Sequence, residues 1–208
     1  MLLTINNLIN LKSLLIPLSE ISLKHETYGM AAVLVPLVDM GAEWHILLTL
    51  RASHLRYHAG EVAFPGGMWE EGDDYPVTTA LREAEEEIAL PQGQVSLLGG
   101  LELCDTRHLT RVRPVVGVIP SGLPLIANKS EIEAIFTVPL RFFHEDNRLR
   151  TDIFKRKENG KEKIYWVPAY QFQQYEIWGL TAAMIVQLVN RCFNATLCRE
   201  HHAPEKVW

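Results

Sequence analysis

The sequence has few cysteines and no excess of basic residues. Its 208 residues include three cysteines, Cys104, Cys192 and Cys198, whose spacing matches no common metal-binding motif. An odd number of cysteines without such spacing is typical of free thiols in a reducing compartment, so we expect a cytoplasmic protein. The formal net charge of −5 provides no excess of Lys and Arg to replace the counterions of a phosphate backbone, and this argues against nucleic-acid binding.

Long hydrophobic runs are also absent. The Leu-rich segment at residues 1–24 is interrupted by Asn6, Asn7, Lys12 and Pro17, and no run approaches the roughly 20 apolar residues that span a bilayer. No basic start precedes an unbroken apolar stretch, so we expect neither a signal peptide nor an integral membrane segment. We expect this segment to dock on the domain as a helix, with a membrane-surface helix as the alternative.

The chain also lacks internal repeats and low-complexity tracts. Its length is that of one domain, which we expect to span residues 1–208. The hydrophobic content of 48% allows a core of good size. We expect residues 194–208 to form a short polar tail that frays. The oligomeric state is left open, with a dimer among the alternatives.

Hydrophobic patterns predict strands on both sides of one amphipathic helix. Apolar and alternating stretches indicate strands at residues 31–38, 44–51, 62–64, 95–104 and 112–119. Turn residues at 158–161 predict a hairpin between residues 153–154 and 164–166, and residues 176–193 have the spacing of a long helix. Strands on both sides of a helix, with a second helix near the end of the chain, predict an α/β/α sandwich with a mixed β-sheet.

The amphipathic helix, which we expect to run from a cap at Asp74 to Pro91, has an apolar stripe and an acidic face. Glu83, Glu86 and Glu87 recur at positions i, i+3 and i+4, so their carboxylates share one side of the helix. Adjacent like charges repel unless a cation neutralises them, and Mg²⁺ and Mn²⁺ prefer carboxylate oxygens. Taken alone, an acidic helix is more often a solvated face.

Two glycines upstream of the helix favour a metal site over a solvated face. A short apolar strand runs into Gly66 and Gly67, and an acidic loop at residues 69–76 connects these glycines to the helix. Without a side chain, a glycine allows a backbone amide or carbonyl to approach an ion or a phosphate closely. Arg82 stands four residues before Glu86 and could hold a carboxylate in place.

This stretch resembles the Nudix box, whose pattern is G-x5-E-x7-R-E-U-x-E-E-x-G-U with U aliphatic. The residues that fall on its positions are Gly67, Arg82, Glu83, Ala84, Glu86, Glu87 and Leu90. The chain departs from the pattern at Asp73, which replaces the first Glu, and at Ala89, which replaces the last Gly. It also has one additional residue between Asp73 and Arg82.

The resemblance implies the Nudix fold, which is an α/β/α sandwich, and a catalytic site that depends on Mg²⁺ or Mn²⁺. It implies that the side chains of Glu83, Glu86 and Glu87 bind these metal ions, with help from the backbone of Gly66 or Gly67. It further implies that Arg82 orients the acids and that Glu86 and Glu87 are catalytic.

A second motif is fused to the first. Residues 47–67 match LLTxR[SA]xxxRxxxGxxxFPGG at every fixed position. This signature is similar to that of the coenzyme A pyrophosphatase branch of the Nudix hydrolases. It implies cleavage of coenzyme A or a derivative to 3′,5′-ADP and 4′-phosphopantetheine, with substrate bound by Arg51, Arg56, Phe64 and Gly67. A guanidinium group suits this role because it holds phosphate in a bidentate fork, although surface ion pairs are the alternative for both arginines.

In many Nudix enzymes a glutamate from a loop far along the chain completes the metal site or acts as the base. Glu131 and Glu133 are the candidates here, and a surface ion pair is the alternative for each. Two other functions stay open. One is a Nudix hydrolase of other or broad specificity, acting on ADP-ribose, dinucleoside polyphosphates or nucleoside triphosphates. The other is a non-catalytic module that binds a nucleotide.

Overall fold

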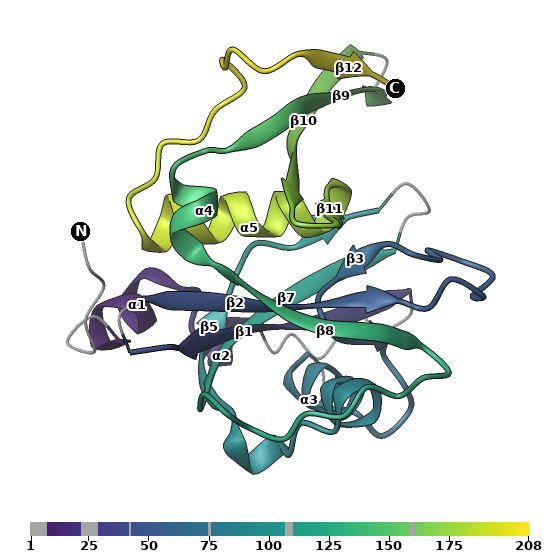
Figure 1. The fold of residues 1–208 in the computed structure, drawn as a ribbon, viewed down its shortest axis with the longest axis vertical. Helices are drawn as coiled ribbons and strands as arrows, with labels where there is room; N and C mark the ends of the chain where they lie inside the picture. The colour runs from purple at the N-terminus through teal and green to yellow at the C-terminus, as the bar shows by residue number, and fades with distance from the viewer. Residues whose placement is uncertain (1–7, 22–28, 42, 75, 107–109, 159–160) are drawn as a thin grey trace.

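The computed structural model describes residues 8–21, 29–41, 43–74, 76–106, 110–158 and 161–208. Its larger sheet has eight strands, five of which lie in the order β3, β2, β1, β7, β5 (Figure 1). These five are Val62–Ala63 (β3), Trp44–Arg51 (β2), Met30–Asp39 (β1), Arg111–Ile119 (β7) and Ser96–Gly100 (β5). The strands that pair beside this series are Gly66–Met68 (β4), Cys104–Asp105 (β6) and Ile132–Pro139 (β8).

The central strand β1 makes the sheet mixed, because it pairs in parallel with β7 and antiparallel with β2 and β4. Its side chains alternate between two hydrophobic cores. Ala31, Val35 and Leu37 face one core, and Ala32 and Leu34 face the other. Burial on both faces explains why the sequence of β1 is an almost continuous apolar run.

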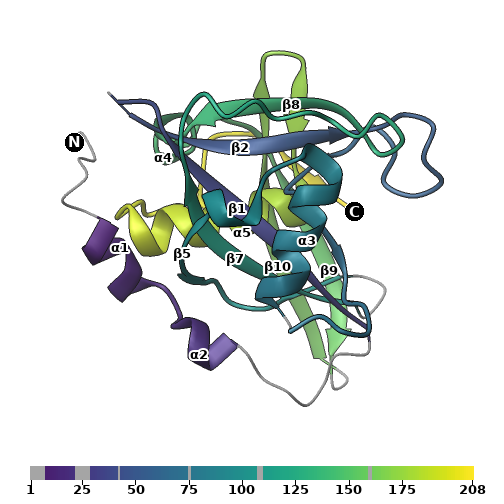
Figure 2. The same ribbon diagram turned by 90° about the horizontal axis from the view of Figure 1, so that it is seen from below.

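Helices cover both faces of this sheet. Helix α3 (Val77–Ile88) packs on one face through Ala80, Ala84 and Ile88, and Figure 2 shows it lying across that face. Helix α5 (Gly179–Cys192) contributes to the core on the opposite face, where Figure 1 shows it above the sheet. The predicted α/β/α sandwich with a mixed sheet is therefore confirmed.

The described residues before β1 pack on this assembly. They form α1 (Leu8–Leu14) and α2 (Leu18–Ile21), which contact α5 and β5. Leu11 and Ile21 are buried in these contacts. The rest of the segment predicted to dock lies outside the described residues. In the part of the chain that the structure describes, no helix is long and apolar enough to cross a membrane.

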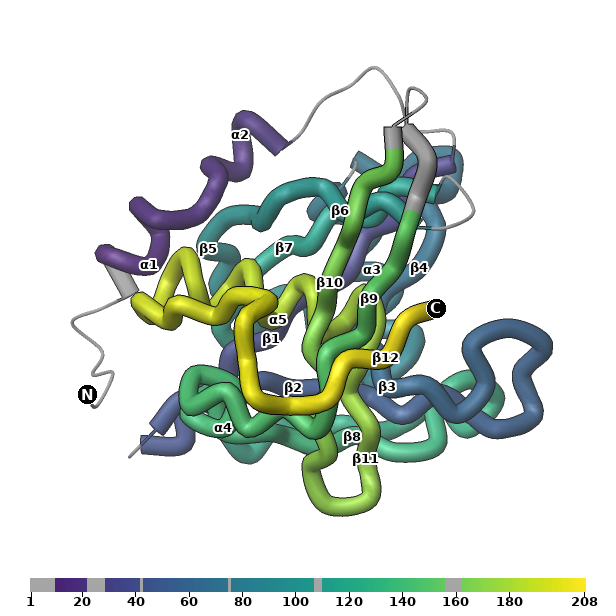
Figure 3. The backbone as a smooth tube through the Cα atoms, turned by 90° about the horizontal axis from the view of Figure 1, so that it is seen from above, coloured from purple at the N-terminus to yellow at the C-terminus, as the bar shows by residue number. Residues whose placement is uncertain are grey.

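A second sheet stands beyond α5, and the sequence predicted only one hairpin of it. Its order is β11, β10, β9, β12, formed by Tyr175–Ile177 (β11), Lys161–Phe172 (β10), Arg148–Glu158 (β9) and Glu205–Val207 (β12). Helix α5 packs against β10, and Figure 3 shows β9 and β10 crossing above that helix. The pairing of β9 with β10 confirms the predicted hairpin, whose turn residues 159–160 lie outside the described part. A short helix, Leu140–His144 (α4), connects β8 to β9, and a 3₁₀ helix at Gln92–Gln94 precedes β5.

Two predictions near the C-terminus are wrong. The helix predicted from residue 176 begins at Gly179, because residues 175–177 pair with β10 as β11. The tail predicted to fray is attached to the second sheet, since β12 pairs in parallel with β9. Ala195 and Leu197 are buried on the way to it. This pairing joins segments far apart in the chain, so no local pattern indicates it.

The predicted strand 95–104 is divided into β5 and β6. Pro114 of β7 stands opposite the interruption, between the residues that pair with Gly100 and Cys104. Proline has no amide hydrogen to donate to a neighbouring strand, so the ladder breaks there. The Pro114 carbonyl instead accepts a hydrogen bond from the Leu101 amide.

The acidic helix starts without the predicted cap. Pro76 is the residue that precedes its first turn, and no side chain caps this end. Asp74 contributes its backbone carbonyl, which accepts a bond from the Thr78 amide, so the prediction that Asp74 is the cap is wrong. The neighbouring carboxylate of Asp73 is the one that turns towards the helix, where it accepts a bond from the Thr79 hydroxyl.

Candidate active site

Helix α3 presents its three central acids at different depths. The Glu87 side chain is 3% exposed, that of Glu83 is 15% exposed and that of Glu86 is 56% exposed. Glu83 and Glu87 face β4, where they contact the backbone of the two glycines. The helix therefore carries a graded series of carboxylates, from buried to solvated.

Glu87 is a buried carboxylate held by two donors. The Gly66 amide donates to its Oε2 at 3.1 Å, and Arg51 Nη1 lies 3.4 Å from its Oε1. Burial, helped by the charges of Glu83 and Glu131, raises the pKa of Glu87 to about 7 against the lowering effect of the two donors. Near neutral pH, a further cation beside Glu87 would stabilise its ionised form.

Glycine is required where β4 lies against α3. A Cβ on Gly67 would collide with the Glu83 carboxylate, and a Cβ on Gly66 would lie 2.5 Å from the Ala32 carbonyl oxygen. Gly66 has no room for a side chain because backbone lies against it, and a side chain at Gly67 would displace the Glu83 carboxylate. This close approach is what allows the Gly66 amide to reach Glu87.

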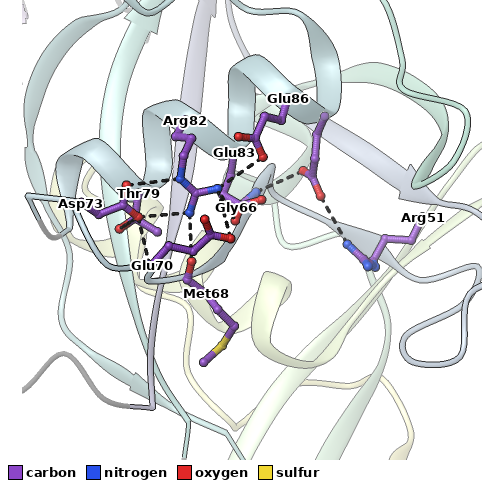
Figure 4. A network of polar contacts seen from close by, with 10 residues as sticks. Arg51, Gly66, Met68, Glu70, Asp73, Thr79, Arg82, Glu83 and Glu86 are labelled. Carbon is purple, nitrogen blue, oxygen red and sulfur yellow. Dashed lines mark hydrogen bonds and ion pairs between the residues drawn. The ribbon is translucent and has the colours of Figure 1, made fainter.

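Arg82 is the centre of a polar network, shown in Figure 4. Its Nε and Nη2 donate to the Asp73 carboxylate at 3.2 and 3.0 Å, and Nη2 also donates to the Met68 carbonyl at 3.1 Å. Its Nη1 donates to Glu83 at 3.1 Å and to Glu86 at 3.3 Å. One guanidinium group therefore ties the acidic loop and β4 to α3 and binds the carboxylates of three acids.

Asp73 lies where the Nudix box has a glutamate, and it reaches Arg82 despite the additional residue in the loop. Its carboxylate also accepts bonds from the Glu70 amide at 3.2 Å and the Thr79 hydroxyl at 2.9 Å. Burial raises the pKa of Asp73, but the bonds from Arg82, Glu70 and Thr79 outweigh burial and lower it below its ordinary value. In turn, the hydrogen bond to Asp73 raises the pKa of Arg82.

Sequence reasoning missed the parts that Thr79, Met68 and Glu70 have in this network. Thr79 is fully buried although it is polar, and its hydroxyl bonds to Asp73. Thr79 stands four residues before Glu83, on the acidic face of the helix, and this position is the signal that could have identified it. Met68 and Glu70 contribute backbone groups, for which side-chain patterns carry no signal.

The donor chemistry of the site fits a hard divalent cation. Burial raises the pKa of Glu83 as well as that of Glu87, although Arg82 opposes the shift in Glu83. A dication would stabilise the ionised form of both. Among the described residues, no three acidic, His or Cys side chains converge on one metal position. Arg82 and Arg51 already engage the carboxylate oxygens, so a cation would replace bonds that these arginines now make.

Of the two later acids, Glu131 is the one near the cluster. Its charge contributes to the raised pKa values of Glu83 and Glu87. Its backbone carbonyl accepts a hydrogen bond from the Ala52 amide, so it is held at the end of β2. Glu133 is exposed on β8.

The residues predicted to bind substrate lie at different places. Arg51 ends β2 and contacts Glu87. Arg56 is exposed on the loop between β2 and β3, with its guanidinium carbon 5.2 Å from the centre of the Tyr57 ring. Phe64 is 4% exposed and belongs to the core beneath the glycine turn. The structure therefore brings Arg51 to the acids and leaves Arg56 in the neighbouring loop.

A family model described as the NUDIX domain matches residues 28–179 of this chain. Proteins from two strains of Escherichia coli, each described as an uncharacterized Nudix hydrolase NudL, are 38% identical over 187 residues. These matches cover 89% of this chain and 93% of the relatives. The chain therefore belongs to the Nudix hydrolases and is an enzyme of that family.

Nudix hydrolases generally use divalent metal ions such as Mg²⁺ or Mn²⁺, and the Nudix domain implies a small-molecule nucleotide substrate. Among solved structures, an Ap4A hydrolase binary complex from Caenorhabditis elegans is similar, with 18% identity and a TM-score of 0.47. That match covers 55% of this chain and 83% of the other.

Proposed function

We propose that this enzyme hydrolyses the pyrophosphate bond of coenzyme A or one of its derivatives, with Mg²⁺ or Mn²⁺ as its metal. The products are 3′,5′-ADP and 4′-phosphopantetheine or its acylated or oxidised form. The proposal rests on the resemblance of residues 47–67 to the coenzyme A signature and on how that segment meets the acids of α3.

The observation that carries the proposal is that two motifs converge on one carboxylate. Arg51 belongs to the first part of the signature and Gly66 to its last part, and both bind Glu87 of the Nudix box. If this segment only stabilised the fold, an arginine beside the acid cluster would not be required. The convergence therefore supports a substrate-binding part for the signature.

Arg51 has a donor left for substrate. Its Nη1 contacts Glu87, while its Nε is buried and has no hydrogen-bond partner within the described part of the chain. A buried donor without a partner costs about 1–3 kcal/mol, and a phosphate oxygen would satisfy it with a charge-assisted bond. We assign to Arg51 the binding of a pyrophosphate oxygen, and to Arg56 that of another phosphate.

The acids divide the remaining tasks. Glu83, Glu86 and Glu87 would hold the cation, while Gly67 leaves the Glu83 carboxylate uncovered. When bound, a divalent cation neutralises charge on the phosphate oxygens and favours ionisation of water. Arg82 keeps Glu83 and Glu86 in position through its bonds to both.

Glu131 is our candidate for the base, and its carboxylate would accept the proton that the attacking water loses. Two observations favour it over Glu133. Its charge acts on Glu83 and Glu87, and its backbone is fixed beside β2 by the Ala52 amide.

A substrate panel tests the proposal. The purified protein is incubated with coenzyme A, ADP-ribose or a nucleoside triphosphate, each with Mg²⁺, with Mn²⁺ and with a chelator, and the products are identified by mass. We expect 3′,5′-ADP from coenzyme A, a higher kcat/KM for coenzyme A than for the other two, and no product with the chelator.

Other results of the panel would overturn the substrate or the catalytic role assigned to this site. Faster cleavage of ADP-ribose or a triphosphate would retain the Nudix chemistry and overturn the substrate assignment. Tight nucleotide binding without turnover of any substrate would overturn the assignment of catalysis to this site.

A further inference from the structure

The loop between β2 and β3, residues 52–61, is held in one conformation by its own hydrogen bonds. The Arg51 amide donates to the Glu61 carbonyl at 3.0 Å, and the Gly60 amide donates to the Arg51 carbonyl at 3.2 Å. The end of the loop is therefore hydrogen-bonded to Arg51, the residue before its start. Figures 1 and 3 show the loop projecting beyond the end of the sheet. Its tip is therefore exposed to solvent, while its base is hydrogen-bonded.

The backbone of the tip is strained. His58 adopts a left-handed conformation with φ of 55°, which is unfavourable for a residue with a side chain. Its ring Nδ1 lies 2.9 Å from a carboxylate oxygen of Glu61, and this contact holds the turn. Backbone strain of this kind is concentrated at functional sites. Here it turns the chain so that Arg56 and Tyr57 are both exposed.

The base of the loop is part of the acid cluster. Arg51 contacts Glu87, the Ala52 amide bonds to the Glu131 carbonyl at 2.8 Å, and the His54 ring lies 3.1 Å from the carbonyl oxygen of the residue before Glu131. A ligand whose phosphates lie at the acids would therefore also lie close to the base of this loop.

We propose that the ring of Tyr57 stacks on the nucleobase of the substrate, with Arg56 beside it to hold a phosphate. Tyr57 is 66% exposed, and the Arg56 guanidinium lies against its ring. That arrangement leaves ring surface for a base, and stacking on an aromatic ring accepts any base because every base has a π-face. The proposal rests on the proposed function only in requiring a substrate that carries a nucleobase.

The fixed positions of the coenzyme A signature include Arg56 and leave position 57 unspecified. Tyr57 is therefore a residue by which this enzyme can differ from others that share the signature. A stacked base adds affinity without contacting the reacting phosphorus, so Tyr57 is expected to change KM rather than kcat.

The test compares two ligands that differ only by the base. Dissociation constants of adenosine 5′-monophosphate and ribose 5-phosphate are measured by NMR titration with Mg²⁺, on the full chain. We expect the wild-type protein to bind the adenosine ligand roughly 5- to 150-fold more tightly, the range that one stacked base represents. Tyr57→Ala should reduce this ratio to near one, and Tyr57→Trp should preserve it.

The matched control is Tyr165→Ala, which removes another exposed tyrosine, on the second sheet. It should leave the ratio unchanged. A wild-type ratio near one, or a ratio that Tyr57→Ala does not change, would overturn the proposal. Failure of the coenzyme A assignment is distinguished by the substrate panel, because the ratio reports the base and not the bond that is cleaved.

Discussion

Replacing Glu87 by Gln should stabilise the metal-free protein and remove its activity. Burial raises the pKa of the Glu87 carboxyl from an ordinary 4.5 to about 7, which means that folding disfavours its ionised form. Each pKa unit corresponds to about 1.4 kcal/mol, so ionised Glu87 costs the fold on the order of 3 kcal/mol. Glutamine has nearly the same shape and never ionises, so the variant avoids this cost.

The size of the effect depends on pH. Below about pH 4.5 the carboxyl is neutral in both the folded and the unfolded protein, and wild type and Glu87→Gln should be equally stable. Between pH 4.5 and 7 the unfolded state ionises first, so the wild-type protein loses stability relative to the variant. Above pH 7 the difference should reach its full value, on the order of 3 kcal/mol.

Urea denaturation at pH 8 and pH 5 with a chelator present measures this difference. Addition of Mg²⁺ should then stabilise the wild-type protein much more than the variant, because binding to the folded state raises its stability. A Glu87→Gln variant less stable than wild type at pH 8, or a difference between them that does not depend on pH, would show that the fold does not disfavour ionised Glu87.

Three further predictions concern the surroundings of this carboxylate. Ala89 ends α3 in a left-handed conformation with φ of 53°, so Ala89→Gly should raise the free energy of unfolding by about 1 kcal/mol. A lower free energy of unfolding for the variant, measured by urea denaturation, would contradict this. Glu131→Gln should lower kcat by roughly 100-fold and Glu133→Gln by less than about twofold, and equal effects in steady-state assays would contradict the choice of base. Asp73→Asn should raise the Mg²⁺ concentration needed for half-maximal rate by roughly tenfold, since Arg82 loses its ionic anchor, and Asp73→Glu should recover part of this loss. An Asn variant with wild-type Mg²⁺ dependence would show that Asp73 does not act through Arg82.

Local patterns in the sequence were enough to predict the central architecture. The apolar run of β1 and the acids at positions i, i+3 and i+4 are periodic features, and periodicity depends on the nearest residues alone. The sandwich followed from the order of such segments. The glycine pair was also recognisable, because the need for a position without a side chain appears directly as Gly66 and Gly67.

Tertiary contacts decide what the sequence leaves open. Spacing alone makes Glu86 and Glu87 equivalent, yet one is solvated and the other is buried, because β4 comes up against only one side of α3. The C-terminal segment is attached by a parallel pairing between residues 205–207 and 151–153. Local sequence patterns do not indicate which distant residues pair in this way. Arg51 likewise meets Glu87 across 36 positions of the chain.

We propose that the acidic face of α3 is the catalytic metal site, and a pair of glutamine variants distinguishes this role from that of a solvated surface. Glu86→Gln removes a carboxylate from that face, and Glu85→Gln makes the same change at the next exposed position, where Glu85 contacts Gln92 instead. Rates are measured with Mg²⁺ on the best substrate of the panel. We predict a loss of at least about 100-fold for Glu86→Gln and a rate close to wild type for Glu85→Gln. Near-full activity of Glu86→Gln would contradict the metal assignment.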